Sequence, residues 1–206
     1  MQYSVEANIK GVSLVFRTAD GVFSPTRVDR GTLAMLSLVD FEKGDKVLDL
    51  GCGWGVVGIL AAKLIGPESV VMVDNDPLAV ELARENAARN GVGEILVCKS
   101  DGFGQLSATG FTKILSNPPY HTDFSVARHF IEKGFNRLVL GGKMYLVVKR
   151  REWYKNKLIS VFGGVQITEA DGYYVLCAEK RSWEYAKQGK GGKSSRSLRD
   201  MVLEKE

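Results

Sequence analysis

Apolar residues form short continuous runs that alternate with helically spaced patterns over most of the chain. Buried strands are predicted at 46–50, 69–73, 94–99, 112–116 and 143–149, the last one following the Gly141-Gly142 pair. Helices are predicted at 56–65, 77–90, 123–138 and around 153–162. Asp76 is expected to cap the second helix, and Gly91 to end it. Strands and helices therefore follow each other in turn.

This alternation predicts a mostly parallel sheet with helices on both faces. Two further strands, at 165–169 and 173–179, flank a turn at Ala170-Asp171-Gly172. They are expected to pair as a closing antiparallel hairpin. The predicted fold is therefore α/β, with a Rossmann-like sheet of seven strands.

The first 45 residues are predicted to be a small accessory segment made of a strand and a helix. Val12, Leu14 and Phe16 lie at every second position, which favours an extra strand or a hairpin. The segment from Arg30 to Val39 has the spacing of a helix.

Composition places the chain among ordinary soluble proteins. It has 206 residues, of which 45% are hydrophobic and 25% charged, as expected for one globular domain. The three cysteines form no CxxC pair, so no metal site is expected, and a reducing cytoplasm is the simplest compartment. No stretch has the apolar length of a signal peptide or of a membrane span.

Positive charge is concentrated near the C-terminus. The net charge is +4, yet the stretch from Lys187 to Arg199 holds five basic residues and no acid, which leaves −1 for the rest. A basic tail rich in glycine and serine suits contact with RNA phosphates. A solvated tail that keeps the protein soluble has the same composition, and both interpretations remain open.

A glycine-rich loop follows the first predicted strand of the sheet. The sequence Asp49-Leu50-Gly51-Cys52-Gly53-Trp54-Gly55 has the spacing GxGxG, and Val56 stands where a dinucleotide fingerprint needs its third glycine. An acid beside the loop disfavours a pyrophosphate but suits the cationic methionine part of S-adenosylmethionine (SAM). A plain glycine turn with a capping aspartate is the alternative.

Carboxylates also follow the next two strands. Asp74, with Asn75 after it, is placed to accept both hydroxyls of a ribose. Asp101 is placed to accept from the adenine amino group, with the backbone at Gly102 beside the ring. Either could be an ordinary loop residue. Three carboxylates after three successive strands are more specific than any one of them.

The fourth strand ends in Asn117-Pro118-Pro119-Tyr120. An exocyclic amine is a poor nucleophile because its lone pair is delocalised into the ring. The Asn117 side-chain oxygen and the Pro118 carbonyl could accept its two N–H groups, and proline fixes that carbonyl in place. Pro119 keeps the turn extended, and Tyr120 could stack on the planar group. A rigid turn without chemistry is the alternative.

These motifs resemble the amino-methylating class I SAM-dependent methyltransferases. A second block, 16–24 followed by 28–32, is similar to the RsmC-type ribosomal RNA guanine-N2 methyltransferases and their small single-domain relatives. In that family this block lies over the SAM pocket, which implies roles for Phe23, Ser24 and Thr32 near the methionine or the target base. The resemblance covers roughly residues 10–180. Larger members of the family carry an additional methyltransferase-like half ahead of the catalytic half, and this chain is expected to lack it.

The resemblance implies an organisation and a function. Residues 1–45 are expected to pack on the SAM pocket, 46–182 to form the methyltransferase domain and 183–206 to be a flexible basic tail. The expected activity is methylation of an RNA base amine, with guanine N2 of ribosomal RNA favoured. Transfer RNA, adenine N6, cytosine N4, a glutamine side chain of a protein, or a non-catalytic RNA-binding role remain alternatives. The expected partner is RNA, with neither metal nor membrane, for a monomer or homodimer.

Overall fold

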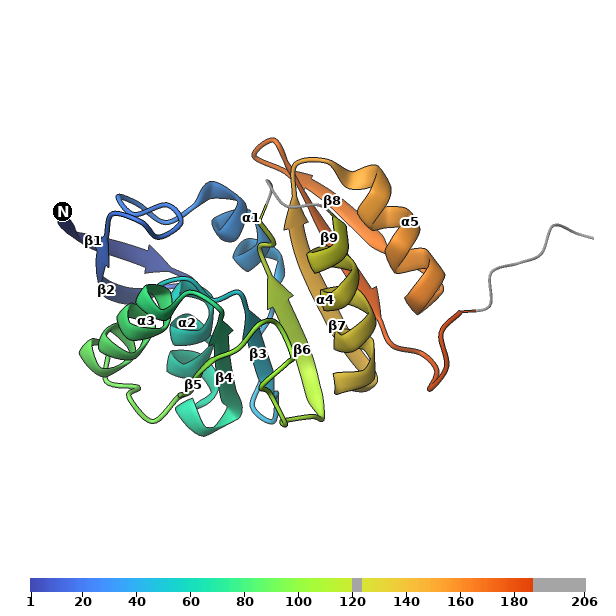
Figure 1. The fold of residues 1–206 in the computed structure, drawn as a ribbon, viewed down its shortest axis with the longest axis horizontal. Coiled ribbons are helices and arrows are strands. Elements are labelled where there is room, and N and C mark those ends of the chain that lie inside the picture. The colour runs from blue at the N-terminus through green and yellow to red at the C-terminus, as the bar shows by residue number, and fades with distance from the viewer. Residues whose placement is uncertain (120–123, 187–206) are drawn as a thin grey trace, which may run out of the picture.

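The computed structural model describes residues 1–119 and 124–186, and their main feature is a seven-stranded sheet (Figure 1). The strand order is β5-β4-β3-β6-β7-β9-β8. All neighbours are parallel except β9, which runs antiparallel to both β7 and β8. The predicted Rossmann-like fold is confirmed. The strands are β3 (Val47–Leu50), β4 (Val70–Asp74), β5 (Leu96–Lys99), β6 (Phe111–Ser116), β7 (Leu138–Val148), β8 (Gln166–Ala170) and β9 (Tyr173–Glu179).

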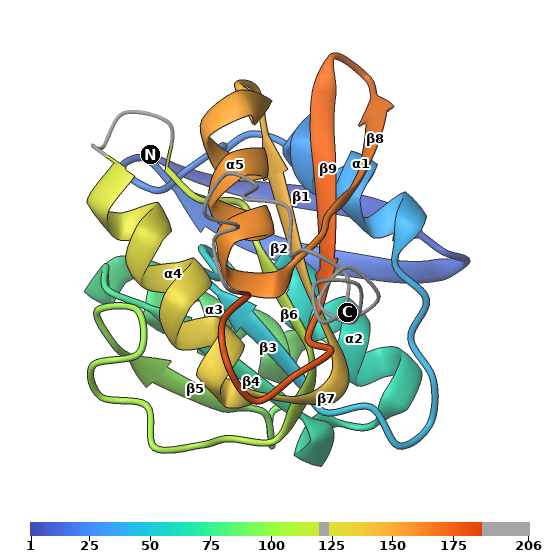
Figure 2. The same ribbon diagram turned by 90° about the vertical axis from the view of Figure 1, so that its right-hand side faces the viewer.

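Helices cover both faces of this sheet because its strands are apolar on both sides. One hydrophobic cluster joins the sheet to α1, α2 and α3, and a second joins it to α4 and α5 (Figure 2). None of the helices in the described part of the chain is long and apolar enough to cross a membrane. The helices are α1 (Arg30–Leu38), α2 (Val56–Ile65), α3 (Pro77–Arg89), α4 (Phe124–Arg137) and α5 (Arg151–Phe162), with a short 3-10 helix η1 (Pro67–Ser69).

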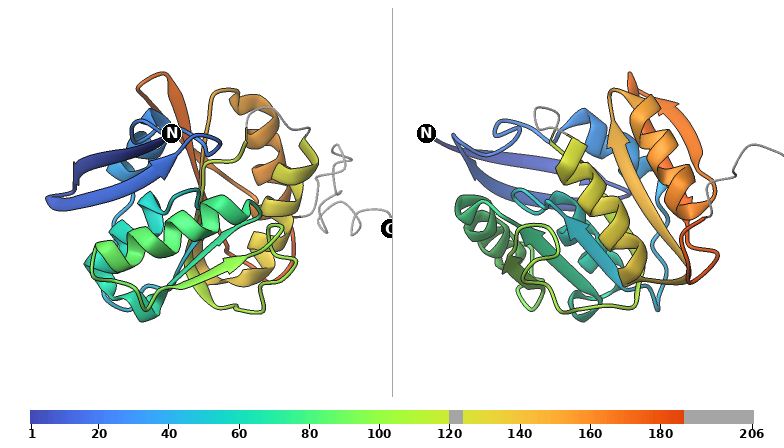
Figure 3. Two further views of the ribbon diagram at one scale, coloured as in Figure 1. Left: turned by 60° about the vertical axis from the view of Figure 1, so that its left-hand side comes forward. Right: turned by 45° about the vertical axis from the view of Figure 1, so that its right-hand side comes forward.

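The N-terminal residues form a separate two-stranded sheet rather than an addition to the main one. Strands β1 (Gln2–Ile9) and β2 (Val12–Ala19) pair as an antiparallel hairpin that lies over α3 (Figure 3). The alternation at 12–16 predicted an extra strand or a hairpin, and the structure has the hairpin, although the sequence did not predict where its first strand, β1, lies. In β1 only Val5 and Ile9 are buried, so its apolar pattern is weak.

Strand β7 begins five residues earlier than predicted. Helix α4 ends at Arg137, and Leu138, which was assigned to the helix, already pairs with Phe111 of β6. The register then shifts, so that Lys113 pairs with Lys143. The Gly141-Gly142 pair therefore lies inside the strand as an irregularity and does not precede it, a common role for glycine within strands.

Residues 183–186, which the sequence assigns to the tail, pack against the two C-terminal helices. The Tyr185 hydroxyl donates to the Glu132 carbonyl oxygen (3.0 Å), and its ring meets Phe135 edge-on. The Ala186 N–H donates to the Val161 carbonyl oxygen (3.1 Å). The basic stretch itself lies outside the described residues.

Candidate active site

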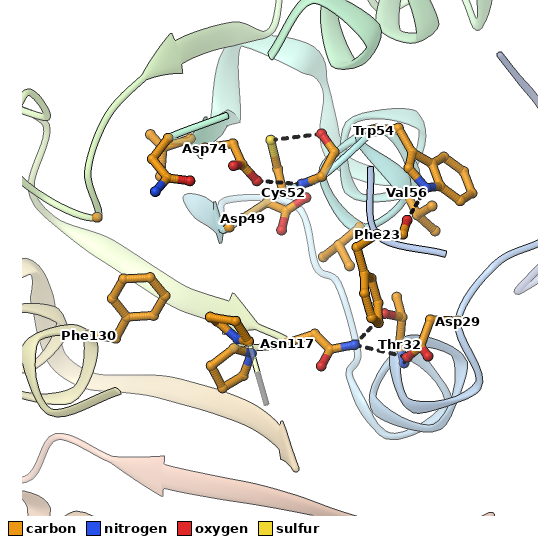
Figure 4. A pocket seen from close by; sticks show the side chains of 18 of the residues that line it. Phe23, Asp29, Thr32, Asp49, Cys52, Trp54, Val56, Asp74, Asn117 and Phe130 are labelled. Carbon is orange, nitrogen blue, oxygen red and sulfur yellow. Dashed lines mark hydrogen bonds between the residues drawn. The ribbon is translucent and has the colours of Figure 1, made fainter. Parts of the chain in front are cut away.

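A cavity of about 370 Å³ opens where the strand order reverses, at the carboxyl ends of β3 to β6 (Figure 4). Open α/β sheets bind their ligands at this position. The cavity brings together every predicted site residue that the structure describes, while Tyr120 lies outside the described residues. Those lining it are Phe23, Ser24, Thr32, Asp49, Gly51, Cys52, Gly53, Asp74, Asn75, Asp101, Gly102, Asn117, Pro118 and Pro119.

The glycine-rich loop folds back onto the end of β4. The N–H groups of Gly51 and Cys52 both donate to the Val73 carbonyl oxygen, each at 2.9 Å. Gly51, Gly53 and Gly55 all have positive φ angles, between 52° and 98°. Only glycine adopts such angles without strain, so the spacing GxGxG is required by this backbone path.

Asp49 lies below the loop with 2% of its surface exposed. Its Oδ2 accepts a hydrogen bond from the N–H of Gly58 in α2 (2.8 Å). Burial raises the pKa of this carboxyl to about 7; the Gly58 N–H opposes the shift, and the nearby Asp74 adds to it. A cationic ligand group next to Asp49 would favour the ionised form. The neighbouring Cys52 thiol is buried too, which raises its pKa and makes it an inert lining group.

Asp74 stands at the end of β4 and is held by two backbone hydrogen bonds. Its Oδ2 accepts from Gly53 (2.8 Å), and its Oδ1 accepts from Asp76 (3.0 Å). Each carboxylate oxygen can accept more than one hydrogen bond. The half-buried carboxylate is therefore rigidly placed and retains the capacity to accept from a pair of hydroxyl groups.

The far end of the cavity lies after β5, around Asp101. The buried Ser100 hydroxyl donates to the Gly102 carbonyl oxygen (2.8 Å) and accepts from the Gln105 N–H (3.1 Å). The Gln105 side chain accepts from the Asp101 N–H (2.9 Å). Phe130 of α4 forms an apolar wall here. A helical pattern of apolar residues predicts which side of a helix is buried, but it cannot distinguish a core position from a pocket wall.

Asn117, at the end of β6, is fixed by the N-terminal segment (Figure 4). Its Nδ2 donates to Asp29 Oδ2 (2.9 Å) and to Thr32 Oγ1 (3.1 Å). The same Asp29 oxygen accepts from the Thr32 N–H (2.9 Å) and so caps α1. Because a carboxylate must face the NH₂ end of an amide, Asp29 determines which way the Asn117 side chain points. Sequence reasoning assigned no role to Asp29.

Phe23 closes the cavity from the loop between β2 and α1. Its carbonyl oxygen accepts from Trp54 Nε1 (3.0 Å), which ties this loop to the glycine-rich loop. The Phe23 ring is 54% exposed and extends toward Thr32 and Asn117 (Figure 4). The Ser24 hydroxyl donates to the Arg27 carbonyl oxygen (2.7 Å) and stabilises the loop itself.

The arrangement suits a ligand that carries positive charge and hydroxyl groups. Asp49, Asp74 and Asp101 lie at or near the carboxyl ends of the strands that line the cavity, and Asp29 lies beside Asn117, whereas a pyrophosphate would need a site without these acids. Apolar side chains such as Val56 and Phe130 provide walls for a planar ring. Asn117 lies beside this cavity as a polar group of fixed orientation.

Comparison with known proteins agrees with this geometry. Residues 13–177 match the family described as the methyltransferase small domain. The chain is 31% identical over 178 residues to the uncharacterized protein YbxB of Bacillus subtilis, covering 84% of this chain and 89% of the relative. It is 32% identical over 180 residues to ribosomal RNA small subunit methyltransferase C of Pseudoalteromonas atlantica, covering 85% of this chain but 52% of the relative.

A solved structure is similar over the same region. It is the Thermus thermophilus 16S rRNA N2 G1207 methyltransferase RsmC in complex with AdoMet and guanosine, with a TM-score of 0.79 and 29% identity. The alignment covers 88% of this chain and 51% of that one, so the chain spans about half the length of the ribosomal RNA methyltransferases it matches. With its fold, its cavity and a family match over most of its length, the chain belongs to the methyltransferase small domain family.

Proposed function

We propose that the chain is a SAM-dependent N-methyltransferase that acts on an exocyclic amine of an RNA base, namely guanine N2 of ribosomal RNA. The observation that carries this proposal is the Asn117 amide, which Asp29 and Thr32 hold in one orientation beside the cavity that Asp49, Asp74 and Asp101 line. The names of the relatives support the choice of ribosomal RNA, and the guanosine bound to the structural neighbour supports guanine.

The cavity residues fit SAM group by group. Asp49 would lie near the methionine ammonium, Asp74 would accept from the ribose hydroxyls, and Asp101 would accept from the adenine amino group. Phe130 would pack against the adenine ring. The loop glycines leave room for close approach of the backbone. When bound, SAM supplies a methyl group on a sulfonium, which is already a good leaving group.

The residues of the chain then have mainly a positioning task. The Nδ2 of Asn117 is held by Asp29 and Thr32, so its side-chain oxygen is at the opposite end of the amide. That oxygen and the Pro118 carbonyl would accept the two N–H groups of the target amine and orient its lone pair. The stacking role of Tyr120 lies outside the described residues and stays a prediction.

The domain organisation follows from the same assignment. Residues 1–45 would serve as a cover for the SAM pocket, 46–182 as the catalytic domain, and the basic part of the 183–206 tail, from Lys187 onward, as a further RNA contact. Phe23, Ser24, Asp29 and Thr32, which line the cavity, all come from the first of these segments.

The test is methyl transfer from labelled SAM to total RNA and, in parallel, to ribosomal proteins. We expect label in RNA, recovered by nucleoside mass spectrometry as N2-methylguanosine. Asn117→Ala should remove this activity and leave SAM affinity nearly unchanged in calorimetry. Label in protein alone would contradict the proposal. A large loss of SAM affinity in Asn117→Ala would contradict the assigned role of this side chain.

A further inference from the structure

The rim of the cavity differs in charge between its two sides. The rim after β4 and β5 carries the carboxylates of Asp74 and Asp101. On the other side, the surface next to the cavity, around the end of β7 and the start of α1, carries Lys149, Arg150, Arg151 and Arg30, which are all exposed and lie outside the cavity lining. A polyanion approaching the cavity is therefore repelled on one side and attracted on the other.

Strand register and packing bring the basic run Lys149-Arg150-Arg151 close to Asn117. Ser116 of β6 pairs with Leu146 of β7, and β7 ends two residues later. The Lys149 ammonium lies 5.4 Å from the centre of the Tyr173 ring. Gly31 packs so closely against the same ring that a side chain at this position would collide with it. Gly31 is two residues from Asp29, which holds Asn117. Packing contacts thus lead from the basic run to the Asn117 side chain.

The first turns of α4 and α5 lie at the same edge (Figure 1), and they carry Phe124 and Trp153. The rings of Phe124 and Trp153 stack at 4.3 Å between centres, with 14° between their planes. Phe124 is 44% exposed although it is a large apolar side chain. Arg151 lies over the Tyr174 ring at 4.7 Å. Cations interleaved with exposed rings are typical of surfaces that bind single-stranded nucleic acid.

We infer that this basic-aromatic rim binds the unpaired RNA strand on either side of the target nucleotide. Its members are Arg30, Phe124, Lys149, Arg150, Arg151 and Trp153. The cations neutralise backbone phosphates, and a flanking base stacks at the Phe124-Trp153 pair. A strand is favoured over a duplex because stacking on a side chain requires a base with an exposed face, and the target base must itself leave its stack. The inference rests on the proposed function.

Among the residues that the structure describes, Glu152 and Asp171 form ion pairs with rim cations and do not cancel the rim's charge. Glu152 pairs with Arg151 (3.1 Å) and Lys155 (3.9 Å), and Asp171 pairs with Arg30 (3.5 Å). All of these side chains are exposed. Exposed pairs are weak, so phosphates can replace either acid as the partner of an arginine.

The inference is tested with the triple variant Lys149→Gln, Arg150→Gln, Arg151→Gln, by titrating a labelled single-stranded oligoribonucleotide at several salt concentrations. We expect the affinity to fall at least about tenfold, and the slope of log K against log salt to fall by about 2, since each phosphate contact contributes roughly 0.7. A duplex of the same sequence should bind the wild type more weakly. Unchanged affinity and slope in the triple variant would overturn the inference.

A matched control removes the same charge elsewhere, with Lys43→Gln, Arg89→Gln and Lys133→Gln, which are exposed residues away from the rim. It should keep most of the slope, and an equal loss in both triple variants would also overturn the inference. Phe124→Ala should weaken binding at an unchanged slope. If the triple variant does not fold, as judged by SAM affinity, the pair Arg30→Gln, Arg150→Gln is measured instead against Lys43→Gln, Arg89→Gln.

Methyl transfer separates this inference from the proposed function. The rim variant should raise KM for RNA and leave kcat close to that of the wild type. If the wild type methylates RNA and the rim variant does so with the same kcat/KM, the rim inference alone is wrong. If the wild type methylates no RNA, the proposed function is wrong, and the binding titration still decides whether the rim holds RNA.

Discussion

At the scale of single residues, the site depends on side chains whose freedom has been removed. Asn117 is bonded to Asp29 and Thr32, and Asp74 is bonded to two backbone N–H groups. Reactions that need orientation more than acid–base chemistry gain most from such fixed groups. Asp29 has two tasks and performs both with one oxygen atom: it caps α1 and it orients the Asn117 side chain.

Two substitutions of Asp29 separate these tasks. Serine caps a helix well but is too short to reach Asn117 as well, whereas asparagine keeps an acceptor at the full length. We expect Asp29→Ser to keep nearly normal stability and SAM affinity and to lower kcat about tenfold, which corresponds to ~1.4 kcal/mol. Asp29→Asn should restore most of kcat. Equal kcat in Asp29→Ser and the wild type would show that the hydrogen bond to Asn117 is not needed.

Asp49 should make both stability and SAM binding depend on pH. Burial raises the pKa of its carboxyl to about 7 in the folded protein, above its ordinary value near 4. The folded state therefore holds this proton more tightly, and the free energy of unfolding should fall as pH rises from about 4 to 7. SAM affinity should instead rise about tenfold between pH 6 and pH 8, because the ammonium favours the ionised carboxyl.

The control for this prediction is Asp49→Asn, which keeps an acceptor for the Gly58 N–H. In this variant, residue 49 no longer titrates, so the fall in the free energy of unfolding between about pH 4 and 7 should become smaller in urea unfolding. SAM should bind the variant weakly at every pH. Titration of the SAM ammonium itself affects both proteins equally. A wild-type affinity that follows the same pH curve as the variant would exclude Asp49 as the partner of the ammonium.

At the scale of elements, α3 holds the N-terminal hairpin with Asn86 in its last turn and Asn90 at its C-cap, one helical turn apart. Asn86 accepts from the Arg17 N–H (2.7 Å) and donates to the Arg17 carbonyl oxygen (2.9 Å), and Asn90 does the same with Val15 (3.1 and 2.8 Å). One turn of helix is about as long as two residues of a strand, so the two asparagine side chains can pair with the backbone of β2 as a neighbouring strand would. Asn86 also donates to the Trp54 carbonyl oxygen (2.9 Å) and so joins the hairpin to the glycine-rich loop.

The two asparagines therefore differ in their expected importance. Asn86 is fully buried, and Asn86→Ala would leave several buried backbone groups without partners. We expect it to lower the free energy of unfolding by about 2–3 kcal/mol and to weaken SAM binding through the Trp54 loop. Asn90→Ala, at a half-buried position, should cost about 1 kcal/mol and leave SAM affinity unchanged. Urea unfolding measures the effect on stability, and calorimetry measures the effect on SAM affinity. Equal losses of stability and SAM affinity in the two variants would contradict the larger role assigned to Asn86.

At the scale of the whole molecule, the fold places the carboxylates after β4 and β5 and the Asn117 side chain on opposite sides of the strand-order reversal. Strands β3, β4 and β5 bring the carboxylates to one side, and β6, β7 and β9 bring Asn117 and the basic-aromatic rim to the other. The N-terminal segment spans both sides through Phe23 and α1. Under the proposed function, one edge of the sheet would hold a small cation and an RNA strand at the same time.

The basic stretch from Lys187 to Arg199 lies outside the described residues, and its role stays a prediction. Deleting the residues after Gln188 removes four of its five cations. We expect weaker RNA binding and a lower slope of log K against log salt, with SAM affinity unchanged. Its effect should add to that of the rim variant if both contact phosphates. An unchanged slope would leave the tail as a solubility feature.

The sequence by itself determined the order of elements in the seven-stranded sheet and the residues that line the cavity at its carboxyl edge. Apolar periodicity, the GxGxG spacing and the acids after successive strands are local signals, and parallel strands bring their carboxyl ends to one edge whatever the rest of the chain does. The same locality explains why the start of β7 was placed wrongly, since a glycine pair ends an element in one context and interrupts a strand in another. Only the tertiary structure decided which distant residues meet. Asp29 and Asn117 are 88 residues apart, and Asn86 and Arg17 are 69 apart. Their hydrogen bonds depend on the packing of α1 and the hairpin against the sheet, which leaves no periodic trace in the sequence.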